Sequence, residues 1–195
     1  MLIVGLGNPG DRYRNSRHNF GFLVVDQLAV RANITLDRKD FDARWGKGRI
    51  GPMPVLLAQP QTFMNLSGVA VRNLAGFFRL ETSEMLVVHD DLDLPFATIR
   101  FKAGGGHGGH RGLMSLDERL GSSAYRRLRM GIGRPDDRMS PESYVLQSFS
   151  PEEEKALPGI LGNASEAIEV LIAEGMQTAM NRYHCRNRGE MPPDQ

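Results

Sequence analysis

The 195-residue sequence has only one cysteine, Cys185, and no apolar run long enough to span a membrane as a helix. A single cysteine cannot form an internal disulfide, which excludes the small secreted folds that depend on disulfides. Because no basic leader followed by an apolar stretch precedes Leu2, we expect a cytoplasmic protein that does not contact membranes. The composition, 41% hydrophobic and 24% charged, is that of an ordinary globular chain. We predict one domain over residues 1–195, with a disordered tail from about residue 190.

Several common cofactor and catalytic motifs are missing or incomplete. The glycines of residues 5–10 match the GxGxxG pattern of dinucleotide-binding proteins. Pro9 removes a backbone donor there and Asp11 would repel a pyrophosphate, so we interpret this match as accidental. The second glycine-rich stretch, Gly104–Gly109, is not followed by the Gly-Lys-Ser/Thr of a P-loop. No Gly-x-Ser-x-Gly sequence is present either, which leaves a serine nucleophile such as Ser67 weakly supported.

Charge is unevenly distributed along the chain. Residues 98–138 contain nine Lys or Arg and four Asp or Glu, a net charge of +5, whereas the whole chain carries +1. Phosphate groups respond to such a local excess, so nucleic acid or another polyphosphate is a candidate partner. A solvated surface with scattered arginines explains the same count.

Three apolar runs with the length of buried strands end in polar residues. The runs are Leu2–Leu6, Val55–Ala58 and Met85–Val88, and the polar residues that follow them are Asn8 with His18, Asn65, and Asp90. Alternating strand and helix patterns favour parallel neighbouring strands, and ligands bind outside the carboxyl ends of such strands. We therefore expect these four side chains to meet in one cleft of an α/β sheet.

The remaining pattern predicts helices around these strands. Ser16 is a candidate helix N-cap, with His18 at the second helical position, where the helix dipole favours the neutral imidazole of a general base. A second helix is expected from Ser67, with Phe77 on its buried face. The other predicted elements are strands at 43–50, 99–102 and 127–132, helices at 113–120, 165–173 and 176–183, a helix start or kink at Pro158, and a mobile lid at 134–141.

A pair formed by His18 and Asp90 would suit the attack of water on an ester. A carboxylate that accepts one ring N–H fixes the tautomer of an imidazole and leaves its other nitrogen to take a proton. The neutral amides of Asn8 and Asn65 can hold a carbonyl or a water without changing the charge of the site. Taken singly, each of these residues also fits a packing, capping or turn role, and only their convergence favours catalysis.

Metal binding is the alternative chemistry. The potential ligands are His89, Asp90, Asp91, Asp93, His107 and His110. Their spacings match no metallohydrolase signature, and two of these histidines lie on glycine-rich backbone that holds ligands poorly. We expect neither a metal nor a cofactor.

Four blocks of the sequence resemble the signature blocks of bacterial peptidyl-tRNA hydrolases, in the same order. They are GLGNPGDRYRNSRHNFGF (5–22), PQTFMNLSG (60–68), HDDLDLP (89–95) and FKAGGGHGGHRGL (101–113). The resemblance covers nearly the whole chain. It implies a monomeric single-domain α/β enzyme with a mixed, mostly parallel sheet flanked by helices. Such an enzyme hydrolyses the ester between a peptide and the 3′ ribose of tRNA, without a metal or cofactor.

The resemblance also implies roles for individual residues. His18 matches the catalytic base of the family and Asp90 the acid that orients it. The residues that match its substrate cleft are Asn8, Tyr13, Phe63, Met64 and Asn65. Lys102 and Arg129 match the basic pair that holds the 5′ phosphate of tRNA.

One position departs from the family pattern. Arg111 stands where many relatives carry an asparagine that holds the substrate or water, so a substrate-binding role of the guanidinium is expected in its place. A non-catalytic RNA-binding module on the same scaffold is the rival interpretation. The joint presence of Asn8, His18 and Asp90 argues against it, because RNA binding alone needs no base paired with a carboxylate.

Overall fold

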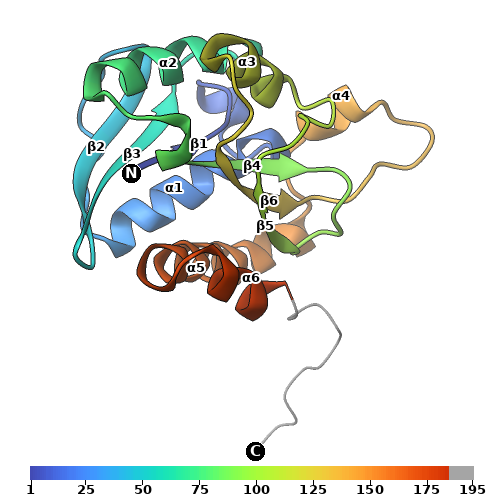
Figure 1. The fold of residues 1–195 in the computed structure, drawn as a ribbon. Helices are drawn as coiled ribbons and strands as arrows, with labels where there is room; N and C mark the ends of the chain where they lie inside the picture. Colours follow the sequence, from blue (N-terminus) through green and yellow to red (C-terminus); the bar gives the residue numbers. More distant parts are fainter. Residues whose placement is uncertain (185–195) are drawn as a thin grey trace, which may run out of the picture.

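The computed structural model describes residues 1–184, and its middle layer is a six-stranded sheet (Figure 1). The strands, in sheet order, are β2 (Ala43–Ile50), β3 (Met53–Pro60), β1 (Leu2–Gly5), β4 (Met85–Asp91), β6 (Arg126–Gly131) and β5 (Ile99–Ala103). The four inner strands are parallel, whereas β2 and β5 run antiparallel to their neighbours at the two edges. This confirms the prediction of a single α/β domain with a mixed, mostly parallel sheet. Cys185 and the tail from residue 190 lie outside the described residues.

Helices cover both faces of the sheet. Those above it in Figure 1 are α2 (Ser67–Phe78) and α3 (Arg111–Leu120), and those below it are α1 (Phe20–Arg31), α5 (Pro151–Glu174) and α6 (Met176–Tyr183). The short helix α4 (Pro141–Val145) lies beside the carboxyl ends of the strands. The sheet therefore separates two apolar cores, one under each layer of helices.

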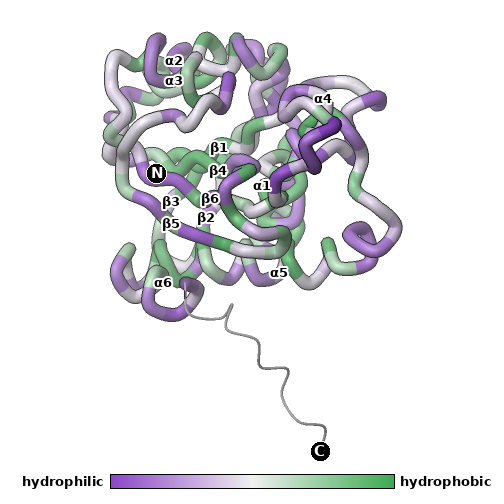
Figure 2. Tube along the Cα trace, turned by 90° about the vertical axis from the view of Figure 1, so that its right-hand side faces the viewer, coloured by the Kyte–Doolittle hydropathy of each residue, from purple (hydrophilic) through white to green (hydrophobic). Residues whose placement is uncertain are grey.

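Alternation along the central strands produces these two cores. In β1, Leu2 and Val4 face α2 and α3, whereas Ile3 faces α1 and α5. β4 repeats the pattern over residues 85–88. Both strands are buried on both faces, and both belong to the hydrophobic stretches of the chain coloured green in Figure 2.

Helix α5 is the one described element whose length and composition would allow it to cross a membrane. We expected no apolar stretch of this length, and that expectation is wrong for residues 151–174. One third (33%) of the most apolar window of α5 is buried, and the helix packs on α1 and α6 (Figure 1). These contacts are those of a helix that covers a sheet.

Two glycines let α1 cross the sheet in direct backbone contact. A Cβ atom on Gly21 would lie 2.4 Å from the backbone nitrogen of Leu6, and one on Gly5 would lie 2.2 Å from the carbonyl oxygen of Gly21. This close approach brings the turn before α1, which carries His18, to the carboxyl end of β4. Gly5 of the GxGxxG match therefore serves helix packing.

Three sequence expectations need correction. Ser16 precedes a 3₁₀ turn over Arg17–Asn19 and its hydroxyl caps no amide, so His18 lies in this turn and α1 begins only at Phe20. Phe77 was expected to be buried but is 65% exposed, although Ala70 and Leu74 of the same predicted face are buried. Residues 151–174 form one continuous helix that contains Pro158.

Candidate functional site

The carboxyl ends of the inner strands open into a cavity of about 610 Å³. All ten residues predicted to form the site line this cavity. They are Asn8, Tyr13, His18, Phe63, Met64, Asn65, Asp90, Lys102, Arg111 and Arg129. The parallel pairing of β1 with β3 and β4 brings four of them together, as the polar strand ends indicated, namely Asn8, His18, Asn65 and Asp90.

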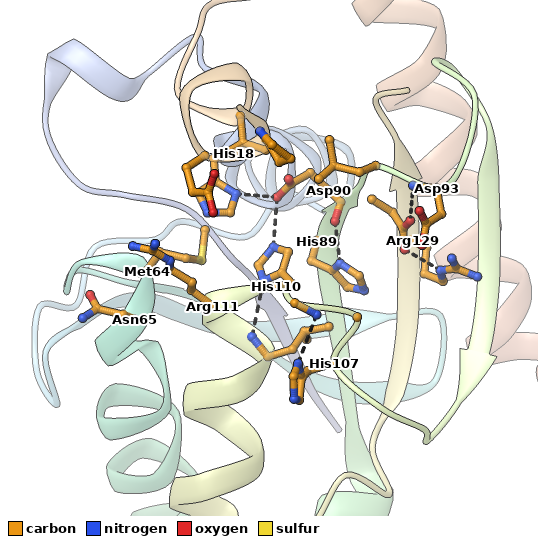
Figure 3. Close-up of a pocket in the computed structure, with 18 of the residues that line it drawn as sticks. His18, Met64, Asn65, His89, Asp90, Asp93, His107, His110, Arg111 and Arg129 are labelled. Atoms are coloured by element: carbon orange, nitrogen blue, oxygen red, sulfur yellow. Dashed lines mark hydrogen bonds and ion pairs between the residues drawn. The ribbon is translucent and has the colours of Figure 1, made fainter. Parts of the chain in front are cut away.

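His18 and Asp90 both line the cavity and are in direct contact with each other. The Nδ1–H of His18 donates to Oδ1 of Asp90 over 2.9 Å, and both side chains are buried (Figure 3). Because the carboxylate accepts at Nδ1, the lone pair of neutral His18 is on Nε2. This is the tautomer that a general base requires.

His110 is a second imidazole on the same carboxylate oxygen, a contact that the sequence analysis missed. Its Nε2 lies 3.0 Å from Oδ1 of Asp90 (Figure 3), while its Nδ1 accepts the backbone N–H groups of Gly112 and Leu113 and caps α3. A nitrogen that accepts two amides carries no proton, so Nε2–H is the donor to Asp90. Histidine is not among the residues preferred at a helix N-cap, so the sequence contains no local signal for this capping role.

His18, Asp90 and His110 also have the composition of a metal site, since their ligand atoms lie within 4.8 Å of one another. The hydrogen bonds do not suit that use. An imidazole binds a metal through a lone pair, whereas Nε2 of His110 carries the proton that its capped Nδ1 cannot hold. The three groups instead form a hydrogen-bonded set centred on one carboxylate.

The Asp90 carboxylate is ionised in this setting. Burial alone raises the pKa of Asp90, but His18 and His110 oppose it through charge attraction and hydrogen bonds. The net effect holds the pKa of Asp90 well below its usual value. A negative charge is therefore in place to stabilise a proton arriving on His18.

The amide of Asn8 has a fixed orientation. Its Oδ1 accepts the backbone N–H of Met64 over 2.8 Å, which leaves Nδ2 as the part of the amide available to a ligand. The Asn8 backbone is held in turn by Asn19, whose side chain accepts from its N–H and donates to its carbonyl oxygen, at 2.8 and 2.9 Å. Asn19 was not among the predicted residues, and its buried side chain is not evident from sequence.

The cavity also has an apolar side. Met64 is buried in its wall, whereas the ring of Phe63 is 60% exposed at its rim. Val145 and Leu146 line it from α4 and the residue after this helix. The wall formed by Phe63 and Met64 and the wall formed by Val145 and Leu146 leave room for a peptide or a nucleobase.

Lys102 and Arg129 lie on the basic side of the cavity, on β5 and β6. Arg129 donates through Nε to Asp91 over 2.6 Å, and this pairing helps to keep the pKa of Asp91 below its usual value against the effect of burial. The stem of Lys102 crosses Gly105, where a Cβ atom would lie 2.7 Å from the lysine Cε. Both residues line the cavity.

Arg127 holds the glycine-rich loop in place and was not predicted. Its buried guanidinium donates to the carbonyl oxygens of Gly105 and Gly106, at 2.5 and 2.7 Å. Tyr125 and Asp117 support it from below, through a ring contact and an ion pair at 3.8 Å. The basic excess counted from the sequence is therefore partly structural, because this arginine holds backbone.

Arg111 is the exposed first residue of α3 and lines the cavity. A cation at the positive end of a helix dipole is unfavourable unless an anion or a polar ligand lies near it. Arg134 of the predicted lid also lines the cavity and pairs with Asp93.

The buried imidazole of His89 should make the free energy of unfolding depend on pH. Burial, with a contribution from His110, lowers the pKa of His89 from 6.5 to about 3. Below about pH 6.5, His89 therefore binds a proton in the unfolded chain but stays neutral in the folded chain. The contribution of neutral His89 to the free energy of unfolding is present above pH 6.5 and is lost as the pH falls toward 3. We expect His89→Gln to flatten the fall in unfolding free energy between pH 6.5 and 4.5 by up to about 1.4 kcal/mol per pH unit, measured by urea unfolding.

The control is His107→Gln, which removes an exposed imidazole of the same cavity. It should leave the slope of unfolding free energy against pH unchanged. An unaltered slope in His89→Gln would mean that His89 is not held neutral in the folded chain.

Comparisons with known proteins agree in sequence and in fold. A sequence model of the family described as peptidyl-tRNA hydrolase matches residues 2–191. The peptidyl-tRNA hydrolase of Chloroflexus aurantiacus is 48% identical over 184 residues, which cover 94% of this chain and 98% of that protein. That of Citrifermentans bemidjiense is 48% identical over 185 residues, 95% of this chain and 98% of the relative. A crystal structure of peptidyl-tRNA hydrolase from Acinetobacter baumannii covers 94% of both chains at 37% identity, with a TM-score of 0.89. With matches over almost its entire length, this chain belongs to the peptidyl-tRNA hydrolase family.

Proposed function

We propose that this chain hydrolyses the ester between a peptide, or an N-blocked amino acid, and the 3′ ribose of tRNA, and so recycles tRNA in translation. Peptidyl-tRNA is the substrate of its family, whose members are ester hydrolases. The observation that carries the proposal is the 2.9 Å hydrogen bond from His18 to Asp90 at the wall of the cavity. A module that only bound RNA would have no need of a buried, oriented base.

In the proposed reaction, Nε2 of His18 takes a proton from a water as this water attacks the ester carbonyl carbon. The charge of Asp90 stabilises the imidazolium that forms. The same proton then passes from Nε2 to the 3′ oxygen of the ribose as the bond between carbonyl carbon and oxygen breaks. The products are free tRNA and a peptide with a new carboxyl group.

Uncharged side-chain amides would hold the substrate next to His18. The Nδ2 group of Asn8 is oriented toward a ligand by its bond to Met64, and the exposed Asn65 provides a second amide on the same wall. We assign Phe63, Met64 and Tyr13 to the apolar contacts of the substrate near its ester. Arg111 would supply a guanidinium to a carbonyl or phosphate oxygen.

Lys102 and Arg129 are proposed to bind a tRNA phosphate. We expect Lys102→Ala or Arg129→Ala to raise KM, with a smaller effect on kcat, because each variant removes a phosphate contact and leaves the base intact. The slope of log affinity against log salt should fall in magnitude by about 1. Binding measured at several salt concentrations tests this.

Lys155→Ala is the matched control, since this exposed lysine lies on α5 and does not line the cavity. It should keep both affinity and salt slope. An unchanged slope in Lys102→Ala and Arg129→Ala would place the tRNA phosphate elsewhere.

We further propose that the enzyme acts as a monomer in the cytoplasm. Support comes from α5, the one described helix long and apolar enough to cross a membrane, because it packs on α1 and α6 of the same chain. Light scattering of the purified protein tests the oligomeric state, with a dimeric mass as the opposing result.

The decisive experiment incubates the purified protein and a strong chelator with a tRNA that carries an N-blocked aminoacyl group. Release of the N-blocked acid is expected, at an undiminished rate with the chelator. No release from this ester would reject the proposed activity. Loss of release only with the chelator would indicate a metallohydrolase, and binding of tRNA without release would indicate an RNA-binding module.

A further inference from the structure

Arg17, next to the proposed base, is buried in a set of contacts that the reaction does not explain. Its guanidinium donates to Glu153 over 2.5 Å and to the carbonyl oxygen of Ser148 over 2.7 Å. The two charged side chains are only 8% and 17% exposed. The ring of Tyr144 lies against the other side, 4.4 Å from the guanidinium carbon.

These contacts join the turn that carries His18 to the chain about 130 residues later. Ser16 and Ser148 form an isolated antiparallel bridge, with hydrogen bonds from the N–H of Arg17 to Gln147 and from the N–H of Phe149 to Asn15. This bridge alone is short. The guanidinium of Arg17 extends this bridge, because it binds the carbonyl oxygen of Ser148 and then Glu153 of α5.

The carboxylate of Glu153 is held in place by a second hydrogen bond. Glu153 is the third residue of α5, and its Oε2 also accepts the backbone N–H of Ser150 in a capping box. The carboxylate that fixes the start of α5 therefore also fixes Arg17. Tyr144 belongs to α4, whose neighbouring residues Val145 and Leu146 line the cavity.

We propose that the buried pair of Arg17 and Glu153 is a positioning device for the reaction, which holds His18 against Asp90 and joins the base to the α4 wall of the cavity. It acts through the backbone of the 3₁₀ turn and does not touch the substrate. A base displaced by about 1 Å can lose two orders of magnitude in rate. The expected effect on kcat rests on the proposed function, whereas the expected effect on the position of His18 does not.

The first test measures kcat and KM for Arg17→Gln and Glu153→Gln. We expect kcat to fall roughly 10- to 100-fold and KM to change less than about twofold, because the cavity keeps its contacts while the base is displaced. Glu153→Gln is the milder variant, since glutamine also completes a capping box. Arg17→Lys keeps the charge but not the planar fork, and should recover part of the lost kcat.

The second test needs no activity. In a protein with ¹⁵N-labelled histidine, the bonded Nδ1–H of His18 and Nε2–H of His110 should each give a slowly exchanging proton signal. In Arg17→Gln and Glu153→Gln, the His18 signal should broaden or exchange faster, whereas the His110 signal should persist because α3 holds that ring. His110 is thus an internal reference for folding.

Arg31→Gln is the matched control. Arg31 also joins the N-terminal part of the chain to α5, through Glu169 at 2.8 Å, but this pair is more exposed and does not line the cavity. It should leave kcat, KM and both signals unchanged. If it lowered kcat as Arg17→Gln does, any link between this part of the chain and α5 would suffice and the specific inference would fail.

The outcomes separate the two proposals. An active wild type with normal kcat in Arg17→Gln and Glu153→Gln would overturn the positioning role and leave the proposed function intact. An inactive wild type would reject the function, and the His18 signal would then decide the positioning role alone. Loss of both histidine signals in Glu153→Gln would mean that the pair supports the fold as a whole, which also overturns the inference.

Discussion

Replacing His18 with alanine is expected to lower kcat for an N-blocked aminoacyl-tRNA by roughly 10²- to 10⁴-fold, the usual contribution of a general base. The variant keeps the substrate contacts proposed for Asn8, Lys102 and Arg129, so KM should change little. Single-turnover hydrolysis, with the released acid measured over time, checks this. Circular dichroism of the variant should match the wild type.

His107→Ala is a suitable comparison, because it removes an exposed imidazole from the same cavity without touching Asp90. It should retain kcat within a small factor. Near-normal turnover in His18→Ala would transfer the role of base to another group, and His110 would be the first residue to test.

Asp90→Asn is expected to lower kcat by a comparable amount, roughly 10²- to 10⁴-fold. The amide oxygen can accept the same bonds from His18 and His110 but carries no charge. An imidazolium forming on His18 would then lie buried without its counter-ion. The same single-turnover assay measures the effect.

The neighbouring carboxylate provides a contrast. Asp91 is bonded to Arg129, so Asp91→Asn should alter tRNA affinity and its salt dependence more than kcat. Equal losses of kcat in Asp90→Asn and Asp91→Asn would contradict the assignment of the orienting role to Asp90 alone.

The strand pattern of this sequence carries much information about the cavity. Apolar runs that end in polar residues predict both the parallel strands and the edge at which their side chains meet. Asn8, Asn65 and Asp90 follow from that rule, and the structure places them around one cavity. Their roles stay predictions until the variants are measured.

Helical periodicity was less informative at the end of α2. Ala70, Leu74 and Phe77 share a helical face, but the period of a helix does not tell how far the layer beneath it extends. The ring of Phe77 packs at the surface against Phe41 and Phe78, with ring centroids 4.9 and 5.0 Å away. The tertiary neighbours, rather than the helix, decided its exposure.

The residues that support the site were hardest to predict. His110 both caps α3 and binds Asp90, and Arg127 holds a loop that lies about 20 residues earlier in the chain. Glu153 is 136 residues from Arg17. Such pairs depend on the relative placement of distant elements, which no local pattern encodes.

The long separation of these pairs bears on how the enzyme is made. Apart from the apolar wall at residues 145–146, the residues proposed for catalysis and substrate binding lie before residue 130, yet the turn with His18 pairs with residues 147–149 and Glu153. A nascent chain emerges from its amino end, so it exposes its base long before the support for that base exists. We therefore expect a polypeptide that ends before residue 153 to contain the proposed catalytic residues but to lack the carboxylate that holds Arg17, so efficient hydrolysis should appear only late in synthesis.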